Sequence, residues 1–357
     1  MNDLSSDSHR QEVNPHLRQI LKKKMDLSLS QMVKGILQGD TGMLSRAITL
    51  VESTRAEDRD LAADLIRECL PHSGRSQRIG ITGVPGVGKS TFIETFGSYL
   101  IQEQKRKVAV LAVDPSSQVS HGSILGDKTR MEALSQSPLA FIRPSPSAGS
   151  LGGVARKTRE AIILCEAAGF DTIIIETVGV GQSETTVKSM VDLFMLLLLP
   201  GAGDELQGIK KGIMEMADLI VIHKADGDNA KRANLASADV RRALRLYPED
   251  PREWTIPVEL CSSLEETGIE DIWMDVEKFF RHGEIKGFIQ ENRKEQAEFW
   301  LRESVGELLH DSFFQHPRVA KQWPTVKKEV IEGRISPFEA ARSLMSSFTG
   351  DNSDLSV

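Results

Sequence analysis

The sequence predicts an α/β protein, a doubly wound and mostly parallel sheet with helical extensions at both ends of the chain. Three observations lead to this fold class. Seven apolar runs alternate with helical stretches, a glycine-rich segment directly follows the first run, and the flanking regions show helical periodicity without further strands. The seven runs are 79–82, 108–113, 139–142, 172–175, 193–199, 219–222 and 256–260.

The apolar pattern divides the chain into four parts. Residues 1–75 carry apolar residues at helical spacing and should form an N-terminal helical extension, followed by the sheet domain at 76–284. Residues 285–350 should form C-terminal helices, one of them capped by Ser336, whose apolar side chains need covering by the sheet domain or by a second subunit. Residues 351–357 should form a disordered tail.

The glycine-rich segment after the first run fits the pattern G-x-x-x-x-G-K-[ST] at every fixed position, and it lies between a predicted strand and a predicted helix. In this context the backbone N–H groups of the loop surround phosphate groups. Lys89 can reach the β- and γ-phosphates, and the Ser90 hydroxyl can bind Mg²⁺. The segment predicts binding of a nucleoside triphosphate. The expected contacts are Gly83, Val84, Pro85, Gly86, Val87, Gly88, Lys89, Ser90 and Thr91.

Acidic residues follow the predicted strands on the side of this loop. Asp114 closes the run 108–113, Glu176 closes 172–175, and Asp127 lies in the loop between them. Carboxyl ends of parallel strands converge, and Mg²⁺ prefers carboxylate, water and phosphate oxygens, so these acids are candidate Mg²⁺ ligands with Ser90. The alternative is that they are helix N-caps or surface charges.

The segment His223-Lys224-Ala225-Asp226 follows the sixth run and resembles the N-K-x-D guanine signature, with histidine where the signature has asparagine. An aspartate there accepts hydrogen bonds from guanine N1 and N2, which adenine cannot match. Lys224 would lie along the base. Ser262, after the last run, is compatible with a loop that contacts the base. The alternative is a coincidental lysine and aspartate at the end of a strand.

Composition excludes several other classes. A net charge of −7 and a sequence pI near 5.7 argue against a nucleic-acid binder. The three isolated cysteines indicate a reducing compartment and no thiolate metal site. The N-terminus lacks an apolar signal region, and the longest apolar run, 193–199, is too short to cross a bilayer. We therefore expect a cytoplasmic protein without a membrane segment.

Several stretches together resemble the MeaB/ArgK family of P-loop GTPases, among them GITGVPGVGKST, VAVLAVDPSS, GSILGDKTRM and LPGAGDELQGIKKGI. The resemblance implies a homodimeric GTPase that uses GTP, GDP and Mg²⁺. It also implies a partner, an adenosylcobalamin-dependent acyl-CoA mutase of the methylmalonyl-CoA type, whose cofactor loading the GTPase gates and which it protects or reactivates.

The resemblance also assigns residues. It implies a phosphate and Mg²⁺ site made of Lys89, Ser90, Asp114, Asp127 and Glu176. Asp226 would recognise guanine, and Gly179 could donate its N–H to the γ-phosphate. The glycine-rich loop Gly201–Gly212 would be a switch that signals nucleotide state, with Asp204, Gln207 and Lys210 as its polar members. Lys89, Glu176 and Lys210 are the expected catalytic residues.

Three other functions are compatible with a P-loop. A nucleoside-triphosphate-dependent kinase acting on a transport-related protein would need an acceptor site and a base, and Glu176 could be that base. A nickel-inserting GTPase would usually show a segment rich in histidine or cysteine, which this sequence lacks. A scaffold without hydrolysis is disfavoured by the intact Lys89 and Ser90.

Overall fold

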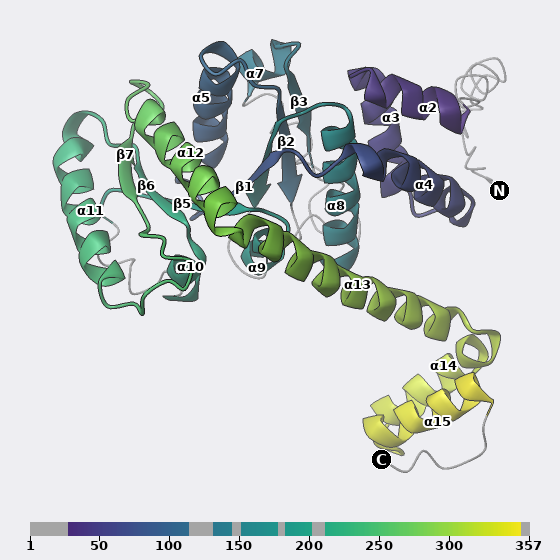
Figure 1. Cartoon of the computed structure of the whole chain (residues 1–357). Coiled ribbons are helices and arrows are strands. Elements are labelled where there is room, and N and C mark those ends of the chain that lie inside the picture. Colours follow the sequence, from purple (N-terminus) through teal and green to yellow (C-terminus); the bar gives the residue numbers. More distant parts are fainter. Residues whose placement is uncertain (1–27, 114–130, 145–150, 178–182, 202–210, 351–357) are drawn as a thin grey trace, which may run out of the picture.

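Seven parallel strands form the central sheet, in the order β3-β2-β4-β1-β5-β6-β7 (Figure 1). The computed structural model describes residues 28–113, 131–144, 151–177, 183–201 and 211–350. Each strand coincides closely with one predicted apolar run, so the doubly wound parallel sheet is confirmed. The strands are β1 (Gln77–Gly83), β2 (Val108–Val113), β3 (Ala140–Arg143), β4 (Thr172–Thr177), β5 (Leu193–Leu198), β6 (Leu219–His223) and β7 (Val258–Cys261).

Helices cover both faces of the sheet, which is why its strands are continuous apolar runs rather than alternating ones. One face packs against α5 (Lys89–Gln102), α7 (Glu132–Gln136) and α12 (Ile269–Lys286). The aromatic core of this layer is made by Phe92, Phe96, Trp273 and Phe279, all buried.

The opposite face carries α8 (Leu151–Ala167), α9 (Ser183–Lys188), α10 (Lys211–Met216) and α11 (Ala230–Leu244). The N-terminal helices pack on α8 and extend this layer outward (Figure 1). They are α2 (Leu29–Leu37), α3 (Thr41–Glu52) and α4 (Ala56–Cys69), and a 3₁₀ turn, Leu70–His72, follows them before β1.

The C-terminal helices lead away from the sheet domain. Helix α13 (Phe288–Gln315) starts against the sheet domain and extends past it, and α14 (Pro317–Ile331) and α15 (Pro337–Thr349) pack together at its far end (Figure 1). Ser336 caps α15 as predicted, its hydroxyl accepting from the Glu339 N–H at 3.1 Å. Within the described ranges, every helix is too short or too polar to cross a lipid bilayer.

The three cysteines are free and buried. Burial raises the pKa of Cys69 to about 11 and that of Cys261 to about 12, so both remain neutral thiols at physiological pH. Neutral, buried thiols of this kind are weak nucleophiles.

Candidate functional site

The glycine-rich loop connects β1 to α5 at the carboxyl edge of the sheet, the edge where the parallel strands end. Gly88 is the N-cap of α5 and has a φ of +94°. A Cβ atom on Gly88 would lie 2.9 Å from Cε1 of His223, and one on Gly83 would lie 2.6 Å from the Leu197 carbonyl oxygen. Only glycine fits these two positions, and the resulting tight loop presents the N-terminus of a long helix to an anion.

Lys89 is the first residue of α5, and its ammonium lies against the loop that precedes it. Its Nζ donates to the Gly83 carbonyl oxygen at 2.8 Å. Burial lowers the pKa of Lys89, and the carboxylates of Glu176 and Glu184 oppose that shift. A lysine ammonium has three donors, so the same group can also bind phosphate oxygens.

Ser90 and Glu176 form the part of the predicted Mg²⁺ site that the structure describes. Glu176 is buried near the end of β4, beside β1, and its Oε1 lies 3.4 Å from the Ser90 hydroxyl oxygen. A carboxylate and a hydroxyl that converge at a P-loop are hard oxygen donors, the kind that Mg²⁺ takes, so these residues fit the ion. Among the described residues, no group of three or more His, Cys, Asp or Glu could hold a metal by itself.

The predicted base-recognition residues lie at the ends of β6 and β7. Asp226 Oδ2 accepts from the Ser262 hydroxyl at 2.6 Å, and Lys224 Nζ donates to the Gly86 carbonyl oxygen at 2.8 Å. Lys224 has a φ of +59°, an unfavourable conformation for a lysine that turns the chain sharply between the strand and Asp226. The sequence signature thus forms one cluster with the P-loop.

The ring of His223 connects this cluster to the P-loop. Its Nδ1 lies 2.7 Å from the Val87 carbonyl oxygen, and its Nε2 lies 2.7 Å from the Ser263 hydroxyl oxygen. The sequence prediction missed Ser263. Its position directly after Ser262 was the only signal available.

The structure therefore brings together the P-loop, Glu176, Lys224, Asp226 and Ser262. Four predicted site residues lie outside the described residues, namely Asp114, Asp127, Gly179 and Lys210, as do Asp204 and Gln207.

Comparison with known proteins identifies the family. The family model described as methylmalonyl-CoA mutase-associated GTPase MeaB matches residues 44–318. GTPase ArgK of Escherichia coli is 44% identical over 319 residues, which cover 89% of this chain and 96% of that protein. The mitochondrial methylmalonic aciduria type A homolog of Mus musculus is 43% identical over 338 residues, covering 92% of this chain and 81% of that protein.

A solved structure agrees with these sequence matches. A crystal structure titled LAO/AO transport system kinase matches with a TM-score of 0.70 and 38% identity, and covers 90% of this chain and 98% of that one. With an intact P-loop, a cluster of the residues predicted to recognise the base, and a family match over most of its length, this chain belongs to the MeaB family of P-loop GTPases.

Proposed function

We propose that this GTPase serves an adenosylcobalamin-dependent methylmalonyl-CoA mutase-type enzyme, gating the loading of its cofactor and protecting or reactivating it. The observation that carries the proposal is the family match over residues 44–318, whose description names association with methylmalonyl-CoA mutase. The name of the mouse relative supports the same partner. A switch of this kind requires that the partner bind the GTP and GDP states with different affinities.

The partner is tested directly with the two purified proteins. Phosphate release from GTP is measured with and without a methylmalonyl-CoA mutase, and complex formation is measured by size-exclusion chromatography in GDP and in a non-hydrolysable GTP analogue. Stimulated hydrolysis and nucleotide-dependent association support the proposal. A rate and an elution profile that the mutase leaves unchanged in both nucleotides would remove the partner from it.

In the proposed mechanism the chain positions GTP and balances charge. Lys89 would hold the β- and γ-phosphates, Ser90 and Glu176 would hold Mg²⁺ directly or through water, and Asp114 and Asp127 are further candidate ligands. Mg²⁺, when bound, offsets negative charge on the phosphate oxygens during transfer to water. Lys210 adds positive charge from the loop Gly201–Gly212, and Gly179 donates its N–H to the γ-phosphate.

Guanine selection is assigned to Asp226. Asp226→Asn exchanges a carboxylate acceptor for an amide, so it should weaken GTP binding by roughly tenfold to a hundredfold, the size expected for a charged hydrogen bond. It should also improve binding of xanthosine triphosphate, whose base has an acceptor where guanine has a donor. Isothermal titration calorimetry with GTP and with xanthosine triphosphate measures both changes in affinity.

The matched control is Asp228→Asn, an exposed aspartate two residues further along the chain. It should leave both affinities as they are in the wild type. Equal affinity of the wild-type protein for GTP and ATP would contradict guanine selection.

A homodimer is the second part of the proposal. From Leu301 onward α13 exposes four aliphatic side chains, each more than 45% exposed, namely Leu301, Val305, Leu308 and Leu309, and Trp323 on α14 is 40% exposed. Exposed apolar side chains along one helix call for a covering surface, and a second copy related by a twofold axis would supply one. Multi-angle light scattering of the full chain measures the mass, and a monomer across the micromolar range would contradict the dimer.

One observation favours a second function, transfer of phosphate to a transport-related protein. It is the name given to the solved relative, LAO/AO transport system kinase. Glu176 would then act as the base. The two functions are separated by following labelled γ-phosphate in the presence of candidate acceptors, since a GTPase delivers it to water and a kinase to the acceptor.

A further inference from the structure

A buried pair of threonines lies behind the candidate site, between two neighbouring strands of the sheet. Thr82 is the residue of β1 directly before Gly83, and Thr177 is the last residue of β4. The Thr177 hydroxyl donates to the Thr82 hydroxyl oxygen at 2.8 Å, and both residues are at most 1% exposed. The backbone register between β1 and β4 runs as far as Ile81 and Glu176, so the hydroxyl bond lies one residue beyond it. It joins the two strands at the point where they reach the site.

The two strands supply different parts of the site directly beside this bond. On β1, Thr82 leads into the P-loop. On β4, Glu176 precedes Thr177, and its Oε1 lies 3.4 Å from the Ser90 hydroxyl oxygen. The distance between the two threonines therefore contributes to the distance between the P-loop and the carboxylate proposed to hold Mg²⁺.

The two hydroxyls lie on the face of the sheet that α9 covers. Side chains alternate along a strand, so Thr82 shares the face of Gly80, and Thr177 shares that of Ile175. A Cβ atom on Gly80 would lie 3.0 Å from Val187 of α9, and Ile175 belongs to the core of the same layer. Valine has the shape of threonine without the polar atom and is at least as favourable in a strand, so stability alone does not call for this pair.

The hydroxyl bond sets a shorter distance than apolar side chains allow. Its two oxygen atoms are 2.8 Å apart, whereas two carbon atoms in contact are about 3.5–4.0 Å apart. A pair of valines would therefore hold the ends of β1 and β4 roughly 1 Å further apart. Mg²⁺ demands near-ideal octahedral geometry, so a change of this size between the P-loop and Glu176 weakens its binding.

We infer that Thr82 and Thr177 are positioning residues for the Mg²⁺ site: their hydroxyl bond fixes the end of β4, with Glu176, at a short distance from the P-loop. They act through Glu176 and Ser90 rather than by binding the ion. The inference rests on the proposed role of these two residues in holding Mg²⁺, and it is independent of the mutase partner.

The experiment measures the dissociation constant of the full-length protein for a non-hydrolysable GTP analogue by isothermal titration calorimetry, once in excess Mg²⁺ and once in EDTA. The ratio of the constant in EDTA to that in Mg²⁺ gives the Mg²⁺ contribution, and urea unfolding gives the stability. Thr82→Val and Thr177→Val should each reduce the ratio by about threefold to tenfold, the size of one net hydrogen bond, and leave the affinity in EDTA unchanged. Thr177→Ser keeps the hydroxyl and should match the wild type.

The double variant Thr82→Val with Thr177→Val separates positioning from stability. It removes both partners of the bond, so its free energy of unfolding should equal or exceed that of the wild type, whereas each single variant removes one partner and should be less stable. Its Mg²⁺ contribution should remain as low as in the single variants, because the same bond is lost in all three. A double variant that regains the wild-type ratio together with its stability would overturn the inference and make the pair a purely structural contact.

Thr172→Val is the matched control. Thr172 is a fully buried threonine at the other end of β4, and its hydroxyl donates to Asp171 at 3.1 Å. The substitution should leave the Mg²⁺ contribution as in the wild type, and an equal fall in this variant would also overturn the inference. Glu176→Gln tests the proposed site itself: an unchanged ratio there would remove Glu176 as a Mg²⁺ ligand, and the inference with it. If Thr82→Val fails to fold by circular dichroism, Thr177→Val and the double variant still decide.

Discussion

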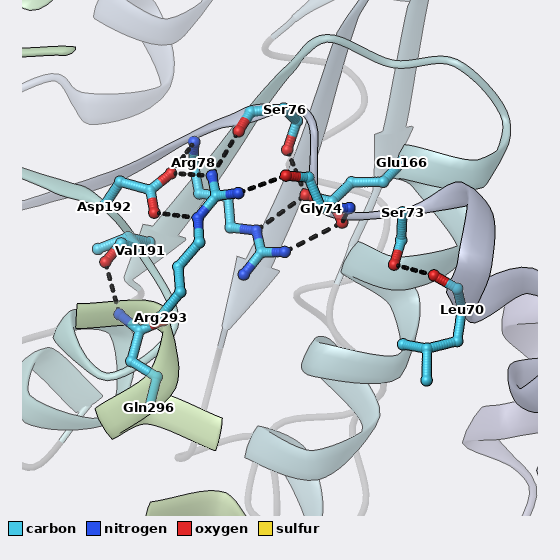
Figure 2. Close-up of polar contacts among 10 residues, drawn as sticks. All are labelled: Leu70, Ser73, Gly74, Ser76, Arg78, Glu166, Val191, Asp192, Arg293 and Gln296. Atoms are coloured by element: carbon cyan, nitrogen blue, oxygen red, sulfur yellow. Dashed lines mark hydrogen bonds and ion pairs between the residues drawn. The ribbon is translucent and has the colours of Figure 1, made fainter. Parts of the chain in front are cut away.

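The two edges of the same sheet use charged residues in different ways. At the amino edge, where β1 and β5 begin, Arg293 of α13 binds Asp192 through two hydrogen bonds, of 2.7 and 2.6 Å (Figure 2). The same guanidinium donates to the carbonyls of Gly74 and Ser76, both at 2.6 Å. At the carboxyl edge, by contrast, the ammonium groups of Lys89 and Lys224 donate to backbone carbonyls of the P-loop.

A second ion pair completes the amino edge. Arg78 at the start of β1 binds Glu166 of α8 at 2.9 and 3.0 Å, and Glu166 also accepts from Ser76 and from the Gly74 N–H (Figure 2). Burial alone would raise the pKa of Glu166, but the hydrogen bonds and charge of Arg78 outweigh it and hold that pKa below its usual value.

The amino edge thus joins α13 to the sheet domain. Beside Arg293, Gln296 and Trp300 on the same helix donate to the carbonyls of Val191 and Ser189, in the connection between α9 and β5. Each of these charges has a charged partner within the chain, so the edge contributes to stability and orientation. The lysines of the carboxyl edge lie among backbone oxygens, where an anionic ligand can compete for them. The comparison predicts that variants at the amino edge alter the stability of the fold, whereas variants at the carboxyl edge alter nucleotide binding and hydrolysis.

The largest effect is expected at the amino edge. Arg293→Ala removes the partner of Asp192, whose side chain is fully buried, and should lower the free energy of unfolding by about 3–5 kcal/mol. Urea unfolding followed by circular dichroism measures the change. Nucleotide affinity of the folded fraction should stay close to that of the wild type.

Arg302→Ala is the matched control for Arg293→Ala. It removes an arginine from the same helix whose partner, Glu298, is 66% exposed, and should cost less than about 1 kcal/mol. Equal losses in the two variants would show that the amino edge is no more important for stability than the helix surface.

The next largest effect concerns the carboxyl edge. Lys89→Ala should reduce kcat for GTP hydrolysis by roughly 10²–10³-fold, as expected for loss of a preorganised charge at a transferring phosphoryl group. The free energy of unfolding should be maintained or should rise, because the lysine ammonium is partly buried and that burial lowers its pKa. Phosphate-release kinetics and urea unfolding test both parts. Lys294→Ala, an exposed lysine on α13 whose partner Glu291 is exposed as well, should change neither, and a large loss of stability in Lys89→Ala would contradict the division between the edges.

The strands could be predicted from the sequence because a parallel sheet covered on both faces leaves a continuous apolar run in each strand. The ion pairs at the amino edge have no comparable pattern in the sequence. Arg293 and Asp192 are 101 positions apart, and Arg78 and Glu166 are 88 apart, so their pairing depends on how helices pack on the finished sheet. A charged residue in a helix has the same appearance in sequence whether it faces solvent or a buried partner.

The candidate site could be predicted where its residues are close together in the sequence or are part of a motif with fixed spacing. The P-loop contacts follow from spacing, and the distances between Ser90 and Glu176 and between Ser262 and Asp226 agree with their predicted neighbourhood. Histidine at position 223 was visible as a departure from the signature, but its second partner was not, because Ser263 is 40 positions away and becomes its neighbour only when β6 pairs with β7.

The smallest predicted effect is a pH dependence of the free energy of unfolding that comes from Glu166 at the amino edge. The pKa of Glu166 is lower in the folded protein than its ordinary value of 4.5, so the carboxylate contributes fully to stability above about pH 4.5. As the pH falls below that value, the unfolded chain takes up the proton first, and the contribution is lost as the pH passes through the folded pKa. Glu166→Gln should therefore lose about 1–3 kcal/mol at pH 7 and flatten the dependence of unfolding free energy on pH below 4.5. Urea unfolding at pH 7, 5 and 4 compares it with Glu298→Gln, an exposed control that should follow the wild type. If Glu166→Gln instead retained the full acid dependence of the wild type, the acid sensitivity of the fold would have to come from carboxylates away from this edge.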